Sequence, residues 1–176
     1  MADDQPWAHD MYDLLTKKHG VTQISYVPDA GHRVMIERAL DDDSVHAVSL
    51  TTEEEGVAMA AGAWLGGEKS VLLMQSSGAG NCVNMFSLPR LGRFPFVTFM
   101  TMRGDFGEGN PWQMPMGLSV ENILKACEFV VLRADSAEEV LPAAEAAMTM
   151  AYKSHQCVAV LLGQKPTPET LLLPLS

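Results

Sequence analysis

Six short runs of apolar residues recur along this chain, and stretches with helical periodicity separate them. The runs are apolar throughout and do not alternate with polar residues, which predicts strands buried on both faces, as in a parallel sheet covered by helices. The expected strands are 22–27, 45–50, 70–75, 94–100, 128–133 and 157–162. The expected helices are 8–19, 31–40, 53–65, 81–91, 118–126 and 137–153. The sequence therefore predicts the α/β class, with a doubly wound, mostly parallel six-stranded sheet and helices on both faces.

The length of the chain, 176 residues, fits one domain. We place this domain at residues 1–165. Residues 166–176 are expected to form an extended C-terminal tail, because they contain three prolines and show no periodicity. Exposure of the tail's leucines to water would be costly, so the tail indicates a docking partner.

An excess of acidic residues excludes several kinds of partner. Lys and Arg together number 12 and Asp and Glu number 22, which gives a formal net charge of −10. Nucleic acid and anionic membrane surfaces repel such a chain, so neither is expected as a partner. The sequence starts without a secretion signal and contains no apolar run long enough for a membrane span. Its three cysteines lack CxxC spacing, so we expect a cytoplasmic protein with reduced thiols.

Three consecutive glutamates open the helix expected after the second strand. Thr52 and Glu55 have the spacing of a capping box, in which each side chain binds the other residue's backbone amide. That motif accounts for Glu55, and the preference of a helix start for acidic residues accounts for Glu54, but a third carboxylate is not needed. Glu53 stands at the first helical position, directly after a strand end, and ligands of doubly wound folds bind at the carboxyl ends of strands. The pattern therefore makes Glu53 a candidate functional acid.

A glycine-rich turn at residues 76–81 follows the third strand. A dinucleotide-binding fingerprint requires a small residue where Val83 stands, and the chain contains no P-loop motif. The glycines allow the backbone to approach a ligand closely, with Ser76, Ser77 and Asn81 as polar groups around it.

The segment 103–117 after the fourth strand is long for a loop without structure of its own, which is typical of functional loops. Arg103 is placed either to bind an anionic group or to pair with Asp105 or Glu108. The length and the glycines of the segment also suggest a lid that closes over a substrate.

The five histidines show no metal-ligand spacing such as HExxH, so no metal site is expected in this chain. His32 is the one histidine that follows an expected strand end. No Gly-x-Ser-x-Gly string occurs, which excludes the usual α/β serine hydrolase.

Four separate loops carry strings that occur in the same order and with similar spacing in one known family. The strings are Val27-Pro28; Thr51-x-Glu53-Glu54-Glu55-Gly56 with Ala61-Gly62-Ala63; Met74-Gln75-x-Ser77-Gly78-x-Gly80-Asn81; and Arg103-Gly104-Asp105 with Gln113-x-Pro115-Met116-Gly117. Through these strings the chain resembles, over residues 8–162, the pyrimidine-binding (PYR) domain of thiamine diphosphate enzymes. The resemblance is strongest to the α subunits of sulfopyruvate decarboxylases and to the related phosphonopyruvate decarboxylases.

This resemblance implies roles for the loop residues. Glu53 would be the acid that activates the cofactor through a hydrogen bond to the pyrimidine N1′, and it should be poorly solvated there. The other cofactor-binding candidates are Pro28, Ser77, Gly78, Gly80 and Asn81. The weaker candidates for binding the second anionic group of a substrate are His32, Arg103 and Gln113.

The resemblance also implies that half of the cofactor site comes from another chain. The family binds diphosphate and Mg²⁺ through a Gly-Asp-Gly motif followed at a distance by Asn. Here Gly104-Asp105-Phe106 lacks the third glycine, and Asn122 is the last asparagine. We therefore expect a β subunit that carries the diphosphate-binding domain and holds Mg²⁺ in a hetero-oligomer. Self-association of the isolated chain is left open.

The leading hypothesis is the α subunit of a thiamine diphosphate-dependent decarboxylase that converts 3-sulfopyruvate into sulfoacetaldehyde and CO₂, active only with its partner. One alternative changes the substrate to phosphonopyruvate or another 2-oxo acid, since Asp29 would be a poor neighbour for a dianionic substrate. The other alternative is a PYR-domain interaction protein without catalysis. The presence of Glu53 and of the glycine-rich turn argues against it.

Overall fold

The computed structural model describes residues 5–165, and the tail expected at 166–176 lies outside them. Within this part, six strands form one parallel sheet in the order β2-β1-β3-β4-β6-β5. The strands are β1 (Val21–Tyr26), β2 (His46–Ser49), β3 (Lys69–Gln75), β4 (Phe96–Thr101), β5 (Val130–Ala134) and β6 (Cys157–Leu162). Each strand end lies within two residues of its expected position, and the predicted α/β class is confirmed.

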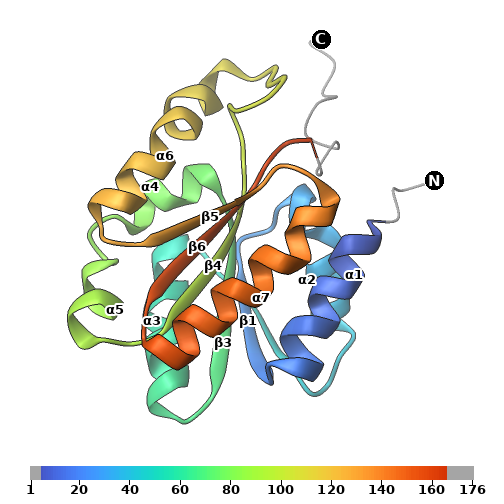
Figure 1. Ribbon diagram of the computed structural model, residues 1–176, viewed down its shortest axis with the longest axis vertical. Coiled ribbons are helices and arrows are strands. Elements are labelled where there is room, and N and C mark those ends of the chain that lie inside the picture. The colour runs from blue at the N-terminus through green and yellow to red at the C-terminus, as the bar shows by residue number, and fades with distance from the viewer. Residues whose placement is uncertain (1–4, 166–176) are drawn as a thin grey trace.

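Helices cover both faces of the sheet (Figure 1). One face packs against α1 (Pro6–Asp13), α2 (Arg33–Leu40) and α7 (Ala137–Ser154). The other face packs against α3 (Glu53–Leu65), α4 (Ala79–Cys82) and α6 (Met114–Ala126), and α5 (Ser87–Gly92) contacts α3. A π-helical turn, η1 (Leu14–Lys18), continues α1, and short 3-10 turns occur at η2 (Ala30–His32), η3 (Ser76–Gly78) and η4 (Pro111–Gln113).

The core consists of two apolar clusters, one on each face of the sheet. Successive strand residues point to opposite faces, so Leu73 and Phe99 join the cluster under α1, α2 and α7, while Leu72 and Met100 join the cluster under α3, α4 and α6. Every residue of β4 and of β6 is buried. The continuous apolar runs of the sequence therefore correspond to strands covered on both sides.

The helix expected at 81–91 is wrong as a single element, because the structure shows two short helices, α4 and α5, with a turn between them. Pro89 lies in the first turn of α5, where a missing N–H costs nothing. In one continuous helix, the same proline would remove a backbone hydrogen bond and would clash with the carbonyl four residues earlier.

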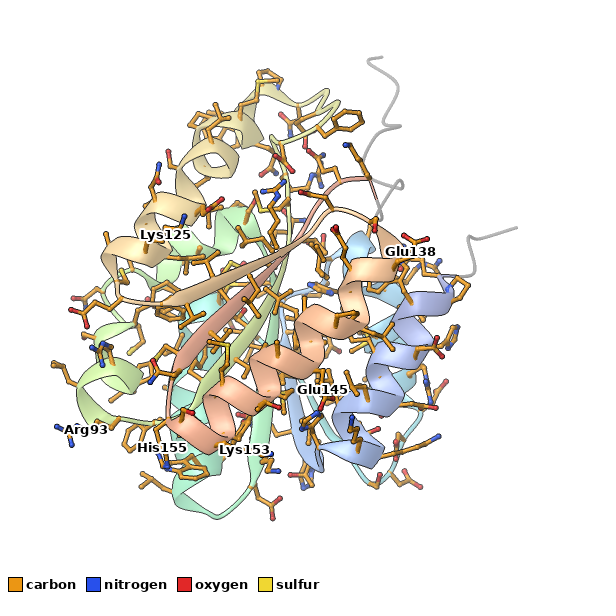
Figure 2. The ribbon with its side chains drawn as sticks, in the orientation of Figure 1. Arg93, Lys125, Glu138, Glu145, Lys153 and His155 are labelled. Atoms are coloured by element: carbon orange, nitrogen blue, oxygen red, sulfur yellow. The ribbon has the colours of Figure 1, made fainter. Side chains whose placement is uncertain are left out.

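The longest helix, α7, has ends that match its dipole. Ser136 and Glu139 form a capping box at its start, where Glu138 also lies, and Lys153 lies in its last turn (Figure 2). His155 ends the helix in the left-handed conformation, with φ 54°. The acidic start and the basic end each favour the helix.

The three cysteines, Cys82, Cys127 and Cys157, are free thiols. Burial raises the pKa of Cys82 to about 12 and that of Cys157 to about 11, so both thiols stay protonated at neutral pH. None of the helices within residues 5–165 is long and apolar enough to cross a membrane.

The order of the strands places a switch point at β1 and β3. From β1 the chain goes outward to β2 through α2 on one face, and it then returns to β3 through α3 on the other face. In such sheets a crevice opens at the carboxyl ends of the strands, between the loops that follow the two strands at the switch point. Here these are the loop after β1 and the turn η3 after β3.

Candidate active site

Glu53 begins α3, and its carboxylate lies against the glycine-rich turn that follows β3. Asn81 Nδ2 donates a hydrogen bond to Glu53 Oε2 at 2.8 Å. A Cβ atom at Gly78 would lie 2.5 Å from Glu53 Oε1 and 2.6 Å from Cδ, so only glycine leaves room for the carboxylate here. Glu53 is half-buried. The poor solvation expected for it is therefore incomplete in the chain by itself.

The capping box expected for Thr52 and Glu55 is wrong in its details. Thr52 is the N-cap residue of α3, but its side chain makes no capping hydrogen bond. The Glu55 carboxylate accepts from the backbone N–H of Thr51 at 2.9 Å, one residue before the N-cap. Glu55 therefore stabilises the start of the helix, as expected, and leaves Glu53 directed at the glycine-rich turn.

Asp29 follows β1 and links the carboxyl ends of three strands. Its Oδ2 accepts a hydrogen bond from Thr101 Oγ1 at 2.6 Å, and its Oδ1 accepts one from Gln75 Nε2 at 2.7 Å. Gln75 Oε1 accepts in turn from Ser77 Oγ at 3.3 Å, so the network reaches the glycine-rich turn. Asp29 is buried. Both oxygens of its carboxylate accept hydrogen bonds within this network, although Asp29 also lines the cavity beside Pro28.

We expect Asp29→Ala to lower the free energy of unfolding of the chain by about 2–3 kcal/mol, because the change leaves the buried hydroxyl of Thr101 and the partly buried amide of Gln75 without their acceptor. Urea unfolding followed by circular dichroism measures this. Asp43→Ala, at an exposed position, is the control and should change stability by no more than about 0.5 kcal/mol. Equal stabilities of the two variants would contradict the role given to Asp29.

The other cofactor-binding candidates lie near Glu53 and Asp29 at the carboxyl edge of the sheet. Pro28 and Gly80 are exposed. A Cβ at Gly80 would lie 3.6 Å from Met116 Sδ, an ordinary contact, so the structure of this chain does not itself require glycine there. Ser76, which is buried, accepts a hydrogen bond from the backbone N–H of Arg103 at 3.0 Å and so joins η3 to the segment after β4.

A cavity of about 420 Å³ opens beside Pro28, at the carboxyl end of β1. It is lined by Pro28, Asp29, Ala30, Arg33, Ile36 and Glu37. A larger hollow, of about 510 Å³, lies between α5 and the end of α6 and includes no residue of the carboxyl edge. Of these two hollows, the cavity beside Pro28 is the one at the carboxyl edge, although Glu53, Gly78 and Asn81 do not line it.

His32, a substrate-binding candidate from the sequence, lies inside the protein. Its side chain is fully buried, and Nε2 lies 3.1 Å from the carbonyl oxygen of Phe99. Burial lowers the pKa of His32, so the ring is neutral at physiological pH. In the chain by itself, His32 does not reach the surface at which a substrate would bind.

Arg103 pairs with Glu108, which is one of the two pairings considered from the sequence. Arg103 Nε lies 3.0 Å from Glu108 Oε2, and both side chains are almost fully buried. Glu108 also accepts from the backbone N–H of Gly104 at 3.1 Å, from that of Asn110 at 2.9 Å, and from Gln164 Nε2 at 3.2 Å. Burial alone would raise the pKa of Glu108, but these donors outweigh it and lower the pKa to about 2.

We expect Glu108→Gln to destabilise the chain in a pH-dependent way. The folded-state pKa of about 2 lies below the ordinary value of 4.5, so the ionised carboxylate contributes its full stability above about pH 4.5. This contribution decreases as the pH falls toward 2. Thermal unfolding of wild type and variant between pH 3 and pH 8 should show a difference on the order of 2 kcal/mol at neutral pH. A difference that does not depend on pH would contradict the assignment.

Gln164, which the sequence analysis did not single out, also binds the segment 103–117. Its Oε1 accepts from the backbone N–H groups of Asp105 and Phe106 at 2.8 and 2.7 Å. The side chain of Asp105 pairs with Arg133. Polar contacts from two other elements therefore fix the base of segment 103–117.

Gln113 ends the turn η4 where the segment doubles back on itself. Gly104 has φ +69°, and a Cβ there would lie 2.6 Å from the carbonyl oxygen of Gln113. A Cβ at Gly117 would lie 1.8 Å from the carbonyl oxygen of Arg103. Gln113 is partly exposed. The close backbone packing explains two of the glycines that made this segment look mobile in the sequence.

The site thus combines the half-buried carboxylate of Glu53, the Asn81 amide that orients it, and the glycine-rich turn with Gly78 and Gly80. This arrangement suits a planar heteroaromatic ring that offers a protonatable nitrogen to Glu53, and the aminopyrimidine of thiamine diphosphate is such a ring. Within residues 5–165, no group of three or more His, Cys, Asp or Glu side chains is arranged to hold a metal ion.

The fold occurs in a solved structure of another protein. A 2-oxoglutarate:ferredoxin oxidoreductase from Magnetococcus marinus superposes with a TM-score of 0.73 at 16% sequence identity, and the match covers 91% of this chain but only 29% of that chain. This likeness shows the fold alone. No family model matches the chain. The parallel sheet, with its loops at the switch point, defines the class as a doubly wound α/β domain of the type found in that oxidoreductase.

Curated relatives identify the family within this class. A sulfopyruvate decarboxylase subunit alpha from Methanocaldococcus jannaschii is 33% identical over 152 residues, which cover 86% of this chain and 89% of the relative. Another from Methanococcus maripaludis is 32% identical over 144 residues and 86% of its length. A phosphonopyruvate decarboxylase from Streptomyces viridochromogenes is 37% identical over 112 residues, but these are only 28% of that longer protein. The chain belongs to the family of sulfopyruvate decarboxylase alpha subunits.

Proposed function

We propose that this chain is the pyrimidine-binding subunit of a thiamine diphosphate-dependent decarboxylase, which converts 3-sulfopyruvate into sulfoacetaldehyde and CO₂ when a partner subunit is bound. The contact of Glu53 with Asn81 and with the bare backbone of Gly78, at the switch point of the sheet, carries the proposal. The membership of the chain in a family of decarboxylase subunits supports it.

The residues of this chain would act mainly on the pyrimidine ring. The Glu53 carboxyl group would share a proton with the ring nitrogen N1′ and so favour the tautomer that acts as a base. Asn81 holds one carboxylate oxygen in place, and Gly78 keeps the other free of steric contact. The cofactor supplies a thiazolium ring that takes up the electron pair left when the carboxyl group departs as CO₂.

A partner subunit would supply the diphosphate-binding half of the site and the Mg²⁺ ion. The relatives covered over most of their length are named alpha subunits, whereas the matching part of the phosphonopyruvate decarboxylases is less than a third of a longer chain. We propose a β subunit as the partner of this chain, because its match covers 86–89% of the length of relatives that are named alpha subunits. The free thiols of the chain support a cytoplasmic location for the complex.

Substrate turnover by the assembled complex separates this proposal from its alternative. CO₂ release and aldehyde formation would be measured with 3-sulfopyruvate, phosphonopyruvate and pyruvate at equal concentrations. We expect kcat/KM to be highest for 3-sulfopyruvate. Turnover of phosphonopyruvate together with inactivity on 3-sulfopyruvate would replace the substrate and keep the cofactor chemistry.

A further inference from the structure

An exposed apolar surface lies at the start of α6. We call it the apolar plate, and it consists of Pro111, Trp112, Met114, Pro115 and Leu118. The exposed fraction is 87% for Trp112, 73% for Leu118 and 40% for Met114. Met114 and Leu118 are four residues apart, so they lie on the same side of the helix. A monomeric protein rarely exposes several large apolar side chains within one short segment without a function.

Charged residues are missing from the segment that forms the apolar plate. No Asp, Glu, Lys or Arg occurs between residues 109 and 120, although 19% of the chain is charged. The second half of α6 is different, since Glu121 and Lys125 form an ion pair at its surface, with Lys125 labelled in Figure 2. Depletion of charge around exposed aromatic residues and methionine is the composition of the core of a protein interface.

Hydrogen bonds shape the backbone at the start of the apolar plate. The backbone N–H of Trp112 donates to Asn110 Oδ1 at 3.1 Å, and that of Gln113 donates to the carbonyl oxygen of Asn110, also at 3.1 Å. The contacts of Glu108 with Arg103 hold the chain just before the plate. A preformed surface loses little conformational entropy on binding, which favours a constitutive partner.

The inner side of the same helical turns touches the candidate site. Met116 lies beside Gly80, and Gly117 lies against the backbone of Arg103 next to η3. A subunit that covers Glu53 and the glycine-rich turn from the carboxyl edge would therefore meet the first turns of α6 as well. Because the plate adjoins the half-complete site, the protein that binds there should be the subunit that completes the site.

We propose that the apolar plate is the docking anchor for the partner subunit that carries the diphosphate-binding half of the site, with Trp112 inserted into an apolar recess of that subunit. The inference rests on the proposed function, because it takes its occupant from there. Large aromatic residues at the centre of an interface commonly dominate its affinity. The rest of the plate would exclude water around Trp112.

The test compares association constants. The chain is mixed with the β subunit from the same organism, with thiamine diphosphate and Mg²⁺ present, and the affinity is measured by sedimentation velocity. Trp112→Ala and Leu118→Ser should each weaken the complex, the tryptophan variant by about 30-fold or more. Leu65→Ser is the matched control, since Leu65 is 74% exposed but lies at the far end of α3. It should change the affinity by less than about 3-fold.

The outcomes separate docking from catalysis and from self-association. Activity of Trp112→Ala should return to the wild-type kcat when the partner is in large excess, because the variant lacks affinity and not chemistry. Unchanged affinity of both plate variants would overturn the docking proposal even if the wild-type pair is an active decarboxylase. Trp112-dependent dimers of the chain alone, unaffected by the partner, would overturn it in favour of a second copy. A plate-dependent complex that decarboxylates no 2-oxo acid would support docking and reject the proposed function.

Discussion

Glu53→Gln in the assembled complex is expected to lower kcat for decarboxylation by about 10²–10⁴-fold. Glutamine keeps the size of the side chain and can still hydrogen-bond to Asn81, but it cannot share a proton with the pyrimidine ring. Such a loss corresponds to roughly 3–5 kcal/mol of activation free energy at about 1.4 kcal/mol per tenfold change. The measurement is steady-state CO₂ release from 3-sulfopyruvate at saturating cofactor.

Glu54→Gln is the matched control for this variant, because Glu54 is the next residue of the same helix turn and is exposed. Its kcat should stay within about 3-fold of wild type. Both variants should retain the melting temperature of the wild-type chain, since the Glu53 carboxylate is only half-buried. Wild-type activity of Glu53→Gln in a correctly assembled complex would remove Glu53 from the mechanism.

Gly78→Ala is expected to be nearly as damaging as loss of the carboxylate. The added methyl group would lie 2.5 Å from Glu53 Oε1, below any normal contact distance, so either the carboxylate or the turn must move. Displacement of a catalytic group by about 1 Å can cost about 10²-fold in rate. We expect a loss of at least this size in kcat/KM, measured with the same assay.

Gly62→Ala controls for the general effect of replacing a glycine. Gly62 lies in α3, and a Cβ there would meet no atom within 4 Å. Alanine should stabilise the helix slightly and leave turnover unchanged. If Gly78→Ala also left turnover unchanged, the position of the Glu53 carboxylate against the turn would not be needed for catalysis.

The sheet and most helices could be predicted because their signals are local. Apolar runs predicted every strand, although only the inner strands are well buried and the edge strands β2 and β5 are partly exposed. The run of acids after β2 predicted the start of α3 at Glu53. The start of α6 was predicted too late, at residue 118, because Pro115 and Gly117 look like helix breakers in a sequence. Proline is tolerated in a first turn, and Gly117 is there because Arg103 packs against it.

The roles of single polar residues were harder to predict, since they depend on distant partners. Glu53 follows β2, and Gly78 and Asn81 follow β3, so all three were expected at the carboxyl edge of the sheet, but only the resemblance to the PYR domain implied that they act on one ligand. Whether Arg103 binds a ligand or pairs with an acid depends on how many donors converge on Glu108, and one of them, Gln164, is 56 residues further along the chain. No sequence pattern gives that distance.

The most direct test of the account is CO₂ release from 3-sulfopyruvate by this chain with thiamine diphosphate and Mg²⁺, with and without the co-expressed β subunit. The account predicts that the chain alone is inactive and that the pair releases CO₂ and sulfoacetaldehyde in equal amounts. Inactivity of a confirmed, cofactor-loaded pair on every 2-oxo acid tried would contradict it.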